Sequence, residues 1–157
     1  MIERFENFQK KCIKWILSEE ELSYESRDVY IRKCRQVNIL PLSQRFILND
    51  LILFHKVVYK IIPVDIPNYL TPFTGQSRLR SSHLDELSFV SSLIPKSSNT
   101  TILEKSFFYR THMIWNSIPL DIRKLGSTSQ FRSNVETHLW DLMLKSDDGE
   151  RGGIGIV

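Results

Sequence analysis

The sequence predicts a mainly α-helical fold of about five helices, with a long irregular segment in the middle of the chain and one or two short strands within it. In both halves of the 157-residue chain, apolar residues recur at spacings of three and four, which is typical of helices with one buried face. The middle of the chain instead holds most of the six prolines and many serines and threonines. The predicted helices cover residues 2–17, 26–37, 44–62, 104–116 and 127–145.

This organisation divides a chain of one domain's length into four parts. Residues 1–62 form the N-terminal helical part, and residues 63–103 form the Pro- and Ser-rich irregular segment. Residues 104–145 add the C-terminal helices of the same domain, and residues 146–157 are expected to be a disordered tail. The expected local structure of the irregular segment is a helical turn from Pro67 and short strands near Leu84, Leu87, Phe89 and Val90.

The limits of the predicted helices follow from residues that start or stop helices. The first helix has no N-cap, because its apolar pattern is already present at Ile2, so we expect it either to fray or to begin upstream of Met1. The expected N-caps of the other helices are Ser23 or Ser26, then Ser43, then Ser127 or Ser129. The expected stops are Asn38 with Pro41 after the second helix and Pro63 after the third.

Two of these helices have distinctive surfaces. The third is apolar on nearly all sides, so it is either a central core helix or a helix that awaits a partner. The first has one apolar face, which we expect to be buried, and a basic face opposite. The apolar face consists of Ile2, Phe5, Cys12, Ile13, Ile16 and Leu17.

No arrangement of residues predicts an enzyme. His55 lies in the apolar third helix, where we expect a buried and hydrogen-bonded histidine rather than a catalytic one. The stretch Ser82-His83-Leu84-Asp85-Glu86 lacks further ligands at metal-binding spacing, so we expect a solvated turn. Asp147-Asp148 lies in the acidic tail without the flanking apolar strands of a polymerase metal site. We therefore expect no catalytic residue, no metal and no cofactor.

The cysteines and the lengths of the apolar runs indicate where in the cell the protein is located. Cys12 and Cys34 are not in a C-x-x-C motif, which argues against a zinc site and favours reduced thiols in an intracellular protein. The N-terminus has no apolar signal region and the chain has no run long enough for a membrane span. The expected location is the cytoplasm or nucleus, with no membrane partner.

The remaining signal is basic helix faces in a chain of net charge +3. Clustered Lys and Arg side chains on one surface can bind phosphates, although each cluster can also be a merely solvated face. The candidate nucleic-acid-binding residues are Lys10, Lys11 and Lys14 in the first helix and Arg32, Lys33 and Arg35 in the second. Other cations, Arg110, Arg123, Lys124 and Arg132, are scattered over the C-terminal half. Trp15 and Tyr109 can stack on bases, but packing in the core is the favoured interpretation.

An ordered set of short motifs in the C-terminal half is the most specific feature of the sequence. It resembles the C-terminal end of non-LTR retrotransposon reverse transcriptases of the jockey-like kind, with isoleucine in place of the leucine before Pro119. The motifs are Ser106-Phe107-Phe108-Tyr109-Arg110, Ile114-Trp115-Asn116-Ser117-Ile118-Pro119, Asp121-Ile122-Arg123, Phe131, and His138-Leu139. Upstream, Phe8-Gln9-Lys10-Lys11 and the stretch from Tyr24 to Arg45 resemble the helices that follow the polymerase domain, so the similarity covers about residues 3–143.

The resemblance implies a non-catalytic, helical region that follows a polymerase domain, in a fragment whose Met1 is an internal methionine. The polymerase and endonuclease motifs of the whole family protein are absent from this chain. The implied partners are element RNA or target DNA and the rest of the reverse transcriptase. The alternative is a structural or protein-interaction module that packs on the polymerase through the apolar third helix.

The motif Trp-Asn-Ser-Ile-Pro has a physical explanation as a structural corner. Asn116 and Ser117 can hydrogen-bond local backbone where the helix must end before Pro119. Trp115 and Ile118 would then anchor the corner in the core. The motif residues assigned a structural role are Phe107, Phe108, Arg110, Trp115, Asn116, Pro119 and Phe131.

Overall fold

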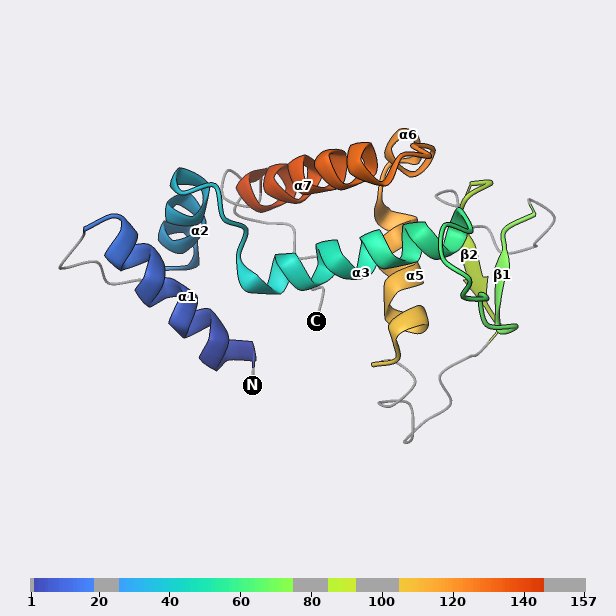
Figure 1. The fold of residues 1–157 in the computed structure, drawn as a ribbon, viewed down its shortest axis with the longest axis horizontal. Helices are drawn as coiled ribbons and strands as arrows, with labels where there is room; N and C mark the ends of the chain where they lie inside the picture. The colour runs from blue at the N-terminus through green and yellow to red at the C-terminus, as the bar shows by residue number, and fades with distance from the viewer. Residues whose placement is uncertain (1, 19–25, 75–84, 93–104, 146–157) are drawn as a thin grey trace. The chain divides into compact units, whose positions relative to one another are not determined.

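The mainly helical fold expected from the sequence is confirmed by a computed structural model, which describes residues 2–18, 26–74, 85–92 and 105–145. Within these ranges there are six helices and one two-stranded antiparallel sheet (Figure 1). The helices are α1 (Ile2–Ile16), α2 (Arg27–Gln36), α3 (Leu42–Val58), α5 (Phe107–Ser117), α6 (Leu120–Arg123) and α7 (Thr128–Lys145), and the strands are β1 (Leu70–Pro72) and β2 (Phe89–Ser91). The predicted tail, 146–157, lies outside the described residues.

The chain divides into two compact units, which are described separately below. Unit 1 comprises residues 1–46 and 136–157, and unit 2 comprises residues 47–135. Unit 1 therefore holds α1, α2, the first turn of α3 and the second half of α7. Unit 2 holds the rest of α3, both strands, α5, α6 and the start of α7.

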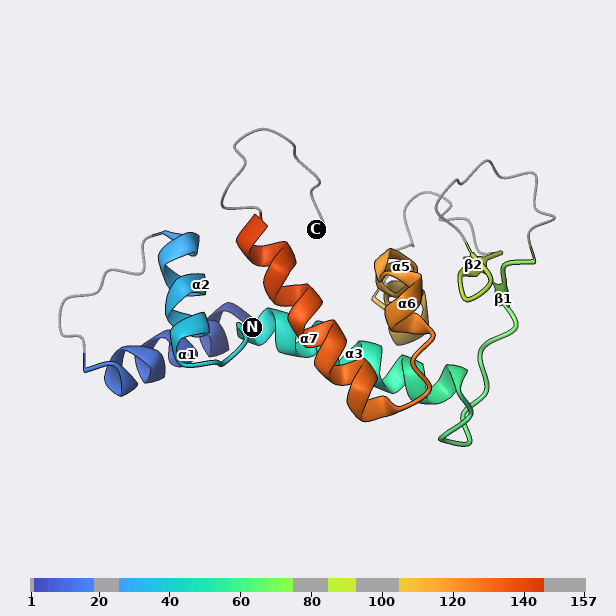
Figure 2. The ribbon, with the colours of Figure 1, turned by 90° about the horizontal axis from the view of Figure 1, so that it is seen from above.

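In unit 1, α1 and α2 lie side by side in both views of the ribbon (Figures 1 and 2). Ser26, one of the two expected N-caps of α2, accepts a hydrogen bond from the Asp28 N–H at 3.3 Å. Asn38 ends α2 as expected, because it adopts a left-handed φ of 54°, which asparagine tolerates well. The buried apolar side chains of this unit are Ile13, Tyr30, Ile31, Cys34, Leu40, Leu139, Trp140 and Met143.

The expected burial of the apolar face of α1 is wrong for part of that face. Ile13 is 1% exposed and Cys12 is half-buried, but Phe5 and Ile16 are 57% and 53% exposed. The buried side of α1 is instead built around Ile13 and the polar Gln9, whose side chain donates to the Leu40 carbonyl at 3.0 Å. The pattern predicted the helix correctly, but part of its apolar face, at Phe5 and Ile16, stays exposed.

The predicted limits of α3 are also wrong at both ends. The helix begins at Leu42 rather than after a Ser43 cap, and it ends at Val58, well before Pro63. Its C-terminus is closed by Lys60 at a left-handed φ of 54° and by a hydrogen bond of 2.8 Å from the Ile61 N–H to the Lys56 carbonyl. This 6→1 bond is typical of a Schellman ending, which needs no proline.

Unit 2 is built around aromatic side chains of α3, α5, α7 and β2. The ring of Phe54 lies 5.3 Å from Trp115 and 5.5 Å from Phe89, and Phe131 lies 5.6 Å from Trp115, all between ring centroids. Phe54, Trp115 and Phe131 are all 0% exposed. This cluster is the core of the unit, because large fully buried rings contribute most of the apolar area removed from water.

The sheet of unit 2 pairs Leu70 with Ser91 and Pro72 with Phe89. The strand at Phe89 confirms one of the expected short strands, whereas the strand at Leu70, three residues after Pro67, was not expected.

The region from Ile118 to Leu120 does not simply end a helix, because α6 begins immediately after Pro119. Proline has a φ suited to the start of a helix, so it ends α5 and precedes α6 in the same corner.

Candidate nucleic-acid interface

Two side chains of α1 hold the N-terminal helices of unit 1 together. The Glu6 carboxylate accepts hydrogen bonds from the N–H groups of Leu42 and Ser43, at 3.1 and 3.3 Å, and from the Tyr30 hydroxyl at 2.5 Å. Gln9 accepts a hydrogen bond from the Arg45 guanidinium and donates to Leu40. Glu6 thus caps the start of α3 in the place expected for Ser43, since a carboxylate satisfies free N–H groups at a helix N-terminus.

Two of the six candidate cations pack on aromatic rings within unit 1. The Lys10 ammonium lies 5.2 Å from the centre of the Tyr30 ring, and the Arg35 guanidinium lies 5.1 Å from the centre of the Trp140 ring. Both distances are within the range of cation–π attraction. Lys10 and Arg35 therefore contribute to packing between the helices of this unit, whatever else they bind.

The other candidate cations lie on the surface of the two helices. Lys11 and Arg32 are exposed and Lys14 is half-buried. Arg32 and Lys33 line a shallow hollow of about 340 Å³ on α2, with Val29 and Gln36. Within the described ranges, no carboxylate forms an ion pair with Lys11, Lys14 or Arg32, so these three are the strongest candidates for contact with phosphate.

A larger hollow of about 400 Å³ in unit 1 has mixed charge. Lys10 and Arg27 line it together with Glu3, Glu6 and Tyr30. Burial raises the pKa of the Tyr30 phenol, and the hydrogen bond to Glu6 raises it further, so the hydroxyl stays protonated and donates. Two carboxylates in this hollow disfavour a polyanion there, which leaves the outer sides of α1 and α2 as the candidate interface.

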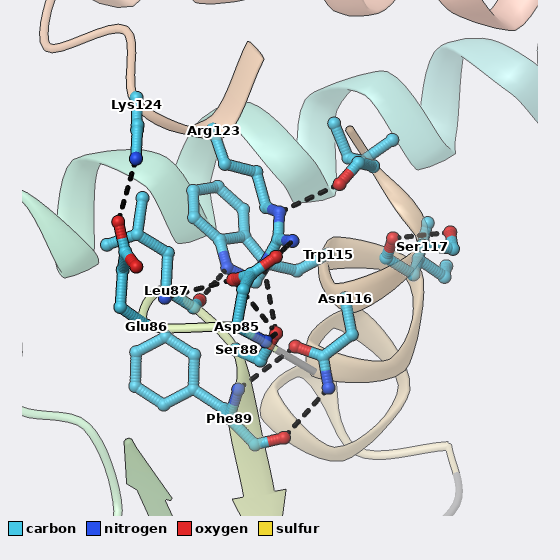
Figure 3. A network of polar contacts seen from close by, with 12 residues as sticks. Asp85, Glu86, Leu87, Ser88, Phe89, Trp115, Asn116, Ser117, Arg123 and Lys124 are labelled. Atoms are coloured by element: carbon cyan, nitrogen blue, oxygen red, sulfur yellow. Dashed lines mark hydrogen bonds and ion pairs between the residues drawn. The ribbon is translucent and has the colours of Figure 1, made fainter. Parts of the chain in front are cut away.

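The motif residues around Trp115 form a corner in unit 2, drawn in Figure 3. The Trp115 indole donates to the Leu87 carbonyl at 2.7 Å. The Asn116 side chain accepts from the Phe89 N–H at 3.0 Å and donates to the Phe89 carbonyl at 2.8 Å. The expectation that Asn116 bonds local backbone is therefore wrong, because it extends the backbone pairing of β2. The expectation for Ser117 is confirmed, since its hydroxyl donates to the Ile114 carbonyl at 2.7 Å.

Arg123, which the sequence left among the scattered cations, is buried in this corner. It is 2% exposed, and its guanidinium donates to the Ile118 carbonyl at 2.8 Å, to the Ser88 hydroxyl at 3.2 Å and to the Asp85 carboxylate (Figure 3). A buried guanidinium with three hydrogen-bond acceptors is typical of a structural role. Sequence reasoning missed this pairing because Asp85 and Arg123 lie far apart in the chain.

The solvated turn expected at residues 82–86 is thus wrong for Asp85. This half-buried residue pairs with Arg123 and also accepts from the Leu87 N–H at 3.0 Å. The exposed Glu86 pairs with the Lys124 ammonium at 2.7 Å, and this partner raises the pKa of Lys124. Ser82, His83 and Leu84 lie outside the described residues, as does Asp147-Asp148.

The buried hydrogen-bonded state expected for His55 is confirmed. Its Nε2 lies 2.7 Å from the Leu125 carbonyl, and its ring stacks on Phe131 with 4.3 Å between centroids. Because a carbonyl only accepts, Nε2 carries the proton. Nδ1 is buried without a hydrogen-bond partner, and burial lowers the pKa of the ring, so His55 is held in its neutral form.

The remaining motif residues also lie in unit 2. Arg110 forms an ion pair with Asp50 at 2.7 Å, and Phe107 packs against Phe108 with 5.0 Å between ring centroids. Ile118 is 2% exposed, which confirms the expected anchoring of the corner by Trp115 and Ile118. Pro119 is half-buried at the start of α6. These contacts give the motif residues roles in packing and hydrogen bonding.

In the described part of the chain, no three His, Cys, Asp or Glu side chains come together as metal ligands. None of the described helices combines the length and apolar character needed to cross a bilayer. No family model, curated protein or solved structure matches the chain.

Proposed function

We propose that this chain is the non-catalytic helical region that follows the polymerase domain of a non-LTR retrotransposon reverse transcriptase, where it binds the phosphates of element RNA or target DNA. The observation that carries the binding part of the proposal is the set of surface cations on α1 and α2, namely Lys11, Lys14 and Arg32. Their neighbours Lys10, Lys33 and Arg35 add to the positive charge of the same two helices.

The pairing of charges supports this use of unit 1. In unit 2, Arg110, Arg123 and Lys124 each have a carboxylate partner within 4 Å, whereas the exposed Lys60, Lys105 and Arg132 lie outside these ion pairs. The three surface cations of unit 1 have none among the described residues. Cations that are already paired gain little from a phosphate, whereas unpaired ones release counterions from the nucleic acid when they bind.

The assignment to the polymerase family rests on the ordered motifs of the C-terminal half. Two of these motifs converge on one corner of unit 2. Trp115 and Asn116 of the first motif bond to Leu87 and Phe89, and Arg123 of the second bonds to Asp85. Residues that build one network have a physical reason to occur together in a sequence. The same proposal places the chain inside the cell, where it meets nucleic acid and where Cys12 and Cys34 stay reduced.

A protein-interaction module is the second candidate. It is favoured by α3, on which Phe46 and Leu53 are 46% and 43% exposed although the opposite side of the helix is buried. Exposed apolar side chains on a central helix can pack on a neighbouring domain of a larger protein. Under this alternative the chain binds the polymerase and has no affinity for nucleic acid.

The proposal is tested by the salt dependence of nucleic-acid binding. We expect the chain to bind a single-stranded RNA and a DNA duplex at low salt, measured by fluorescence anisotropy, with affinity that falls steeply as salt rises. Changing Lys11, Lys14 and Arg32 to Gln should flatten the slope of log K against log salt by about 2 for the single strand and by about 3 for the duplex. These substitutions leave the ring contacts of Lys10 and Arg35 intact, so we expect the fold to be preserved.

A matched control removes the same charge from unit 2. Lys60, Lys105 and Arg132 are all exposed, and changing them to Gln should leave the salt slope unchanged. If both triple variants weaken binding equally, the interaction depends on net charge alone and the interface on α1 and α2 is wrong. If the parent chain does not bind at low salt, nucleic-acid binding is excluded and the interaction module is favoured.

A further inference from the structure

Phe8 and Trp15 carry the two most exposed of the three exposed aromatic rings of α1, the third being that of Phe5. Trp15 is 84% exposed and Phe8 is 67% exposed, so the packing in the core that the sequence favoured for Trp15 is wrong. The two residues are seven apart, which places them two turns apart on the same side of the helix, about 10 Å along its axis. We call Phe8 and Trp15 the aromatic row.

A basic row runs beside the aromatic row. Arg4 and Lys11 are also seven apart and both are exposed. Arg4 precedes Phe8 by four residues and Lys11 precedes Trp15 by four residues, and side chains at this spacing are neighbours on a helix surface. Phe8 and Trp15 therefore each have a cation one turn before them.

The carboxylates of α1 are on another side of the helix. Glu3 and Glu6 both line the hollow shared with Tyr30 of α2, and Glu6 is held there by its hydrogen bonds. Between Arg4 and Trp15 the single carboxylate is that of Glu6, which faces the hollow. The side of α1 that carries the rings therefore has positive but no negative side chains over these residues. This charge pattern is complementary to a phosphate backbone and would repel a basic protein surface.

Rings interleaved with cations have a known physical use. Successive bases of a single strand stack on exposed aromatic side chains while Lys and Arg follow its phosphates. A duplex cannot use the rings in this way, because its bases are already paired and stacked on one another. A purely apolar protein partner would use the rings but not the cations beside them.

We propose that the outer side of α1 is a stacking platform for single-stranded nucleic acid, with bases on Phe8 and Trp15 and phosphates on Arg4 and Lys11. This inference rests on the proposed function and deepens it, because it names single strands as the bound form. It adds Arg4, Phe8 and Trp15 to the interface.

The chain carries its own spectroscopic probe for this platform. Trp115 and Trp140 are 0% and 2% exposed, so Trp15 is the tryptophan that solvent and ligands reach among the described residues. We expect a poly(U) oligonucleotide of about 20 nucleotides to quench the exposed tryptophan emission of the full chain at low salt, because the bases stack on the indole. A DNA duplex of equal charge should bind with little quenching.

Two conservative variants test the role of the rings. Trp15→Leu and Phe8→Leu keep an apolar side chain but remove the π-face, and each should weaken poly(U) binding about 5- to 150-fold. Phe46→Leu is the matched control, because Phe46 is also an exposed ring but lies on α3. It should leave poly(U) affinity unchanged.

The outcomes separate this inference from the proposed function. If poly(U) binds with steep salt dependence but Trp15→Leu binds equally well and no quenching occurs, the platform is excluded and phosphate binding stands. If the parent binds neither poly(U) nor duplex at low salt, both proposals are excluded. If Trp15→Leu instead abolishes self-association of the chain while poly(U) causes no quenching, the row is a protein contact and the inference is overturned.

Discussion

The Trp115 corner of unit 2 and the outer side of α1 in unit 1 use polar and aromatic side chains in opposite ways. In unit 2, Trp115, Asn116 and Arg123 are buried or half-buried, and each has fixed hydrogen-bond partners. In unit 1, Phe8 and Trp15 of α1 are mostly exposed. The residues around Trp115 therefore maintain the fold of unit 2, whereas the exposed rings of α1 in unit 1 are available for binding.

This difference has an energetic basis. A buried polar group that loses its partner costs about 1–3 kcal/mol, so the network around Asn116 and Arg123 constrains every residue that it contacts. Exposed rings and cations contribute little to the stability of the folded state, since they are close to water in both the folded and unfolded states. Substitutions in the Trp115 corner should therefore change stability, whereas substitutions of the exposed rings and cations of α1 should change binding.

The largest effect should come from the core of unit 2. Trp115→Ala removes a fully buried ring and its hydrogen bond to Leu87, and we expect it to lower the free energy of unfolding by about 3–5 kcal/mol. Urea unfolding followed by circular dichroism measures the change. Trp115→Phe, which fills part of the space but loses the hydrogen bond, should cost less. A loss below 1 kcal/mol for the alanine variant would show that the corner is not the core of this unit.

A smaller effect should follow from the pairing of Asn116 with β2. Asn116→Ala leaves the Phe89 N–H and carbonyl without their partner, and we expect a loss of about 1–3 kcal/mol in the same unfolding measurement. Asn116→Asp retains the acceptor for the N–H but not the donor for the carbonyl, so its effect should differ from that of alanine. Ser117→Ala, which removes a single exposed hydrogen bond, serves as the comparison. Equal effects of alanine at 116 and 117 would contradict the special role of Asn116.

The helices were largely predictable from the sequence because they depend on local patterns. The periodicity of apolar residues identified α1, α2, α3, α5 and α7, and Ser26 was recognisable as a cap. The limits of α3 were not predictable, because its start is capped by Glu6, which lies 36 residues from Leu42. Its end is set by the left-handed Lys60, a residue type with no preference for that conformation.

The corner of unit 2 was predictable only in part, for the same reason. The residues of the motif around Trp115 were recognised, and Ser117 was correctly expected to bond local backbone. The partners of Asn116 and Arg123 lie 27 and 38 residues away, and periodicity carries no information about such pairs. The exposure of Trp15 was likewise unpredictable. The sequence pattern shows which residues of a helix share an apolar face, but it does not show how much of that face other helices cover.

The pH dependence of stability should also originate in unit 2. Burial lowers the pKa of both His55 and His112 in the folded chain, so the unfolded chain binds more protons in the window below the ordinary histidine pKa. The stabilisation from neutral histidine is therefore complete above about pH 6.5 and is lost as the pH falls towards the lowered folded values. Melting curves between pH 8 and pH 5 should show a falling midpoint. His55→Gln can still donate to Leu125 but does not titrate, so it should flatten the dependence; an unchanged slope would exclude His55 as a source.

The smallest effect on stability should come from the aromatic row of unit 1. Phe8→Ser and Trp15→Ser replace exposed rings with a small polar side chain, and we expect each to change the free energy of unfolding by no more than about 0.5 kcal/mol. The same measurement on Ile13→Ser, two residues before Trp15 but 1% exposed, should show a loss several times larger. If Trp15→Ser destabilises the chain as much as Ile13→Ser does, the ring is part of the core and the stacking platform is wrong. If it does not, a helix that retains two rings with no role in its own stability has a reason for them elsewhere, and binding of single strands supplies one.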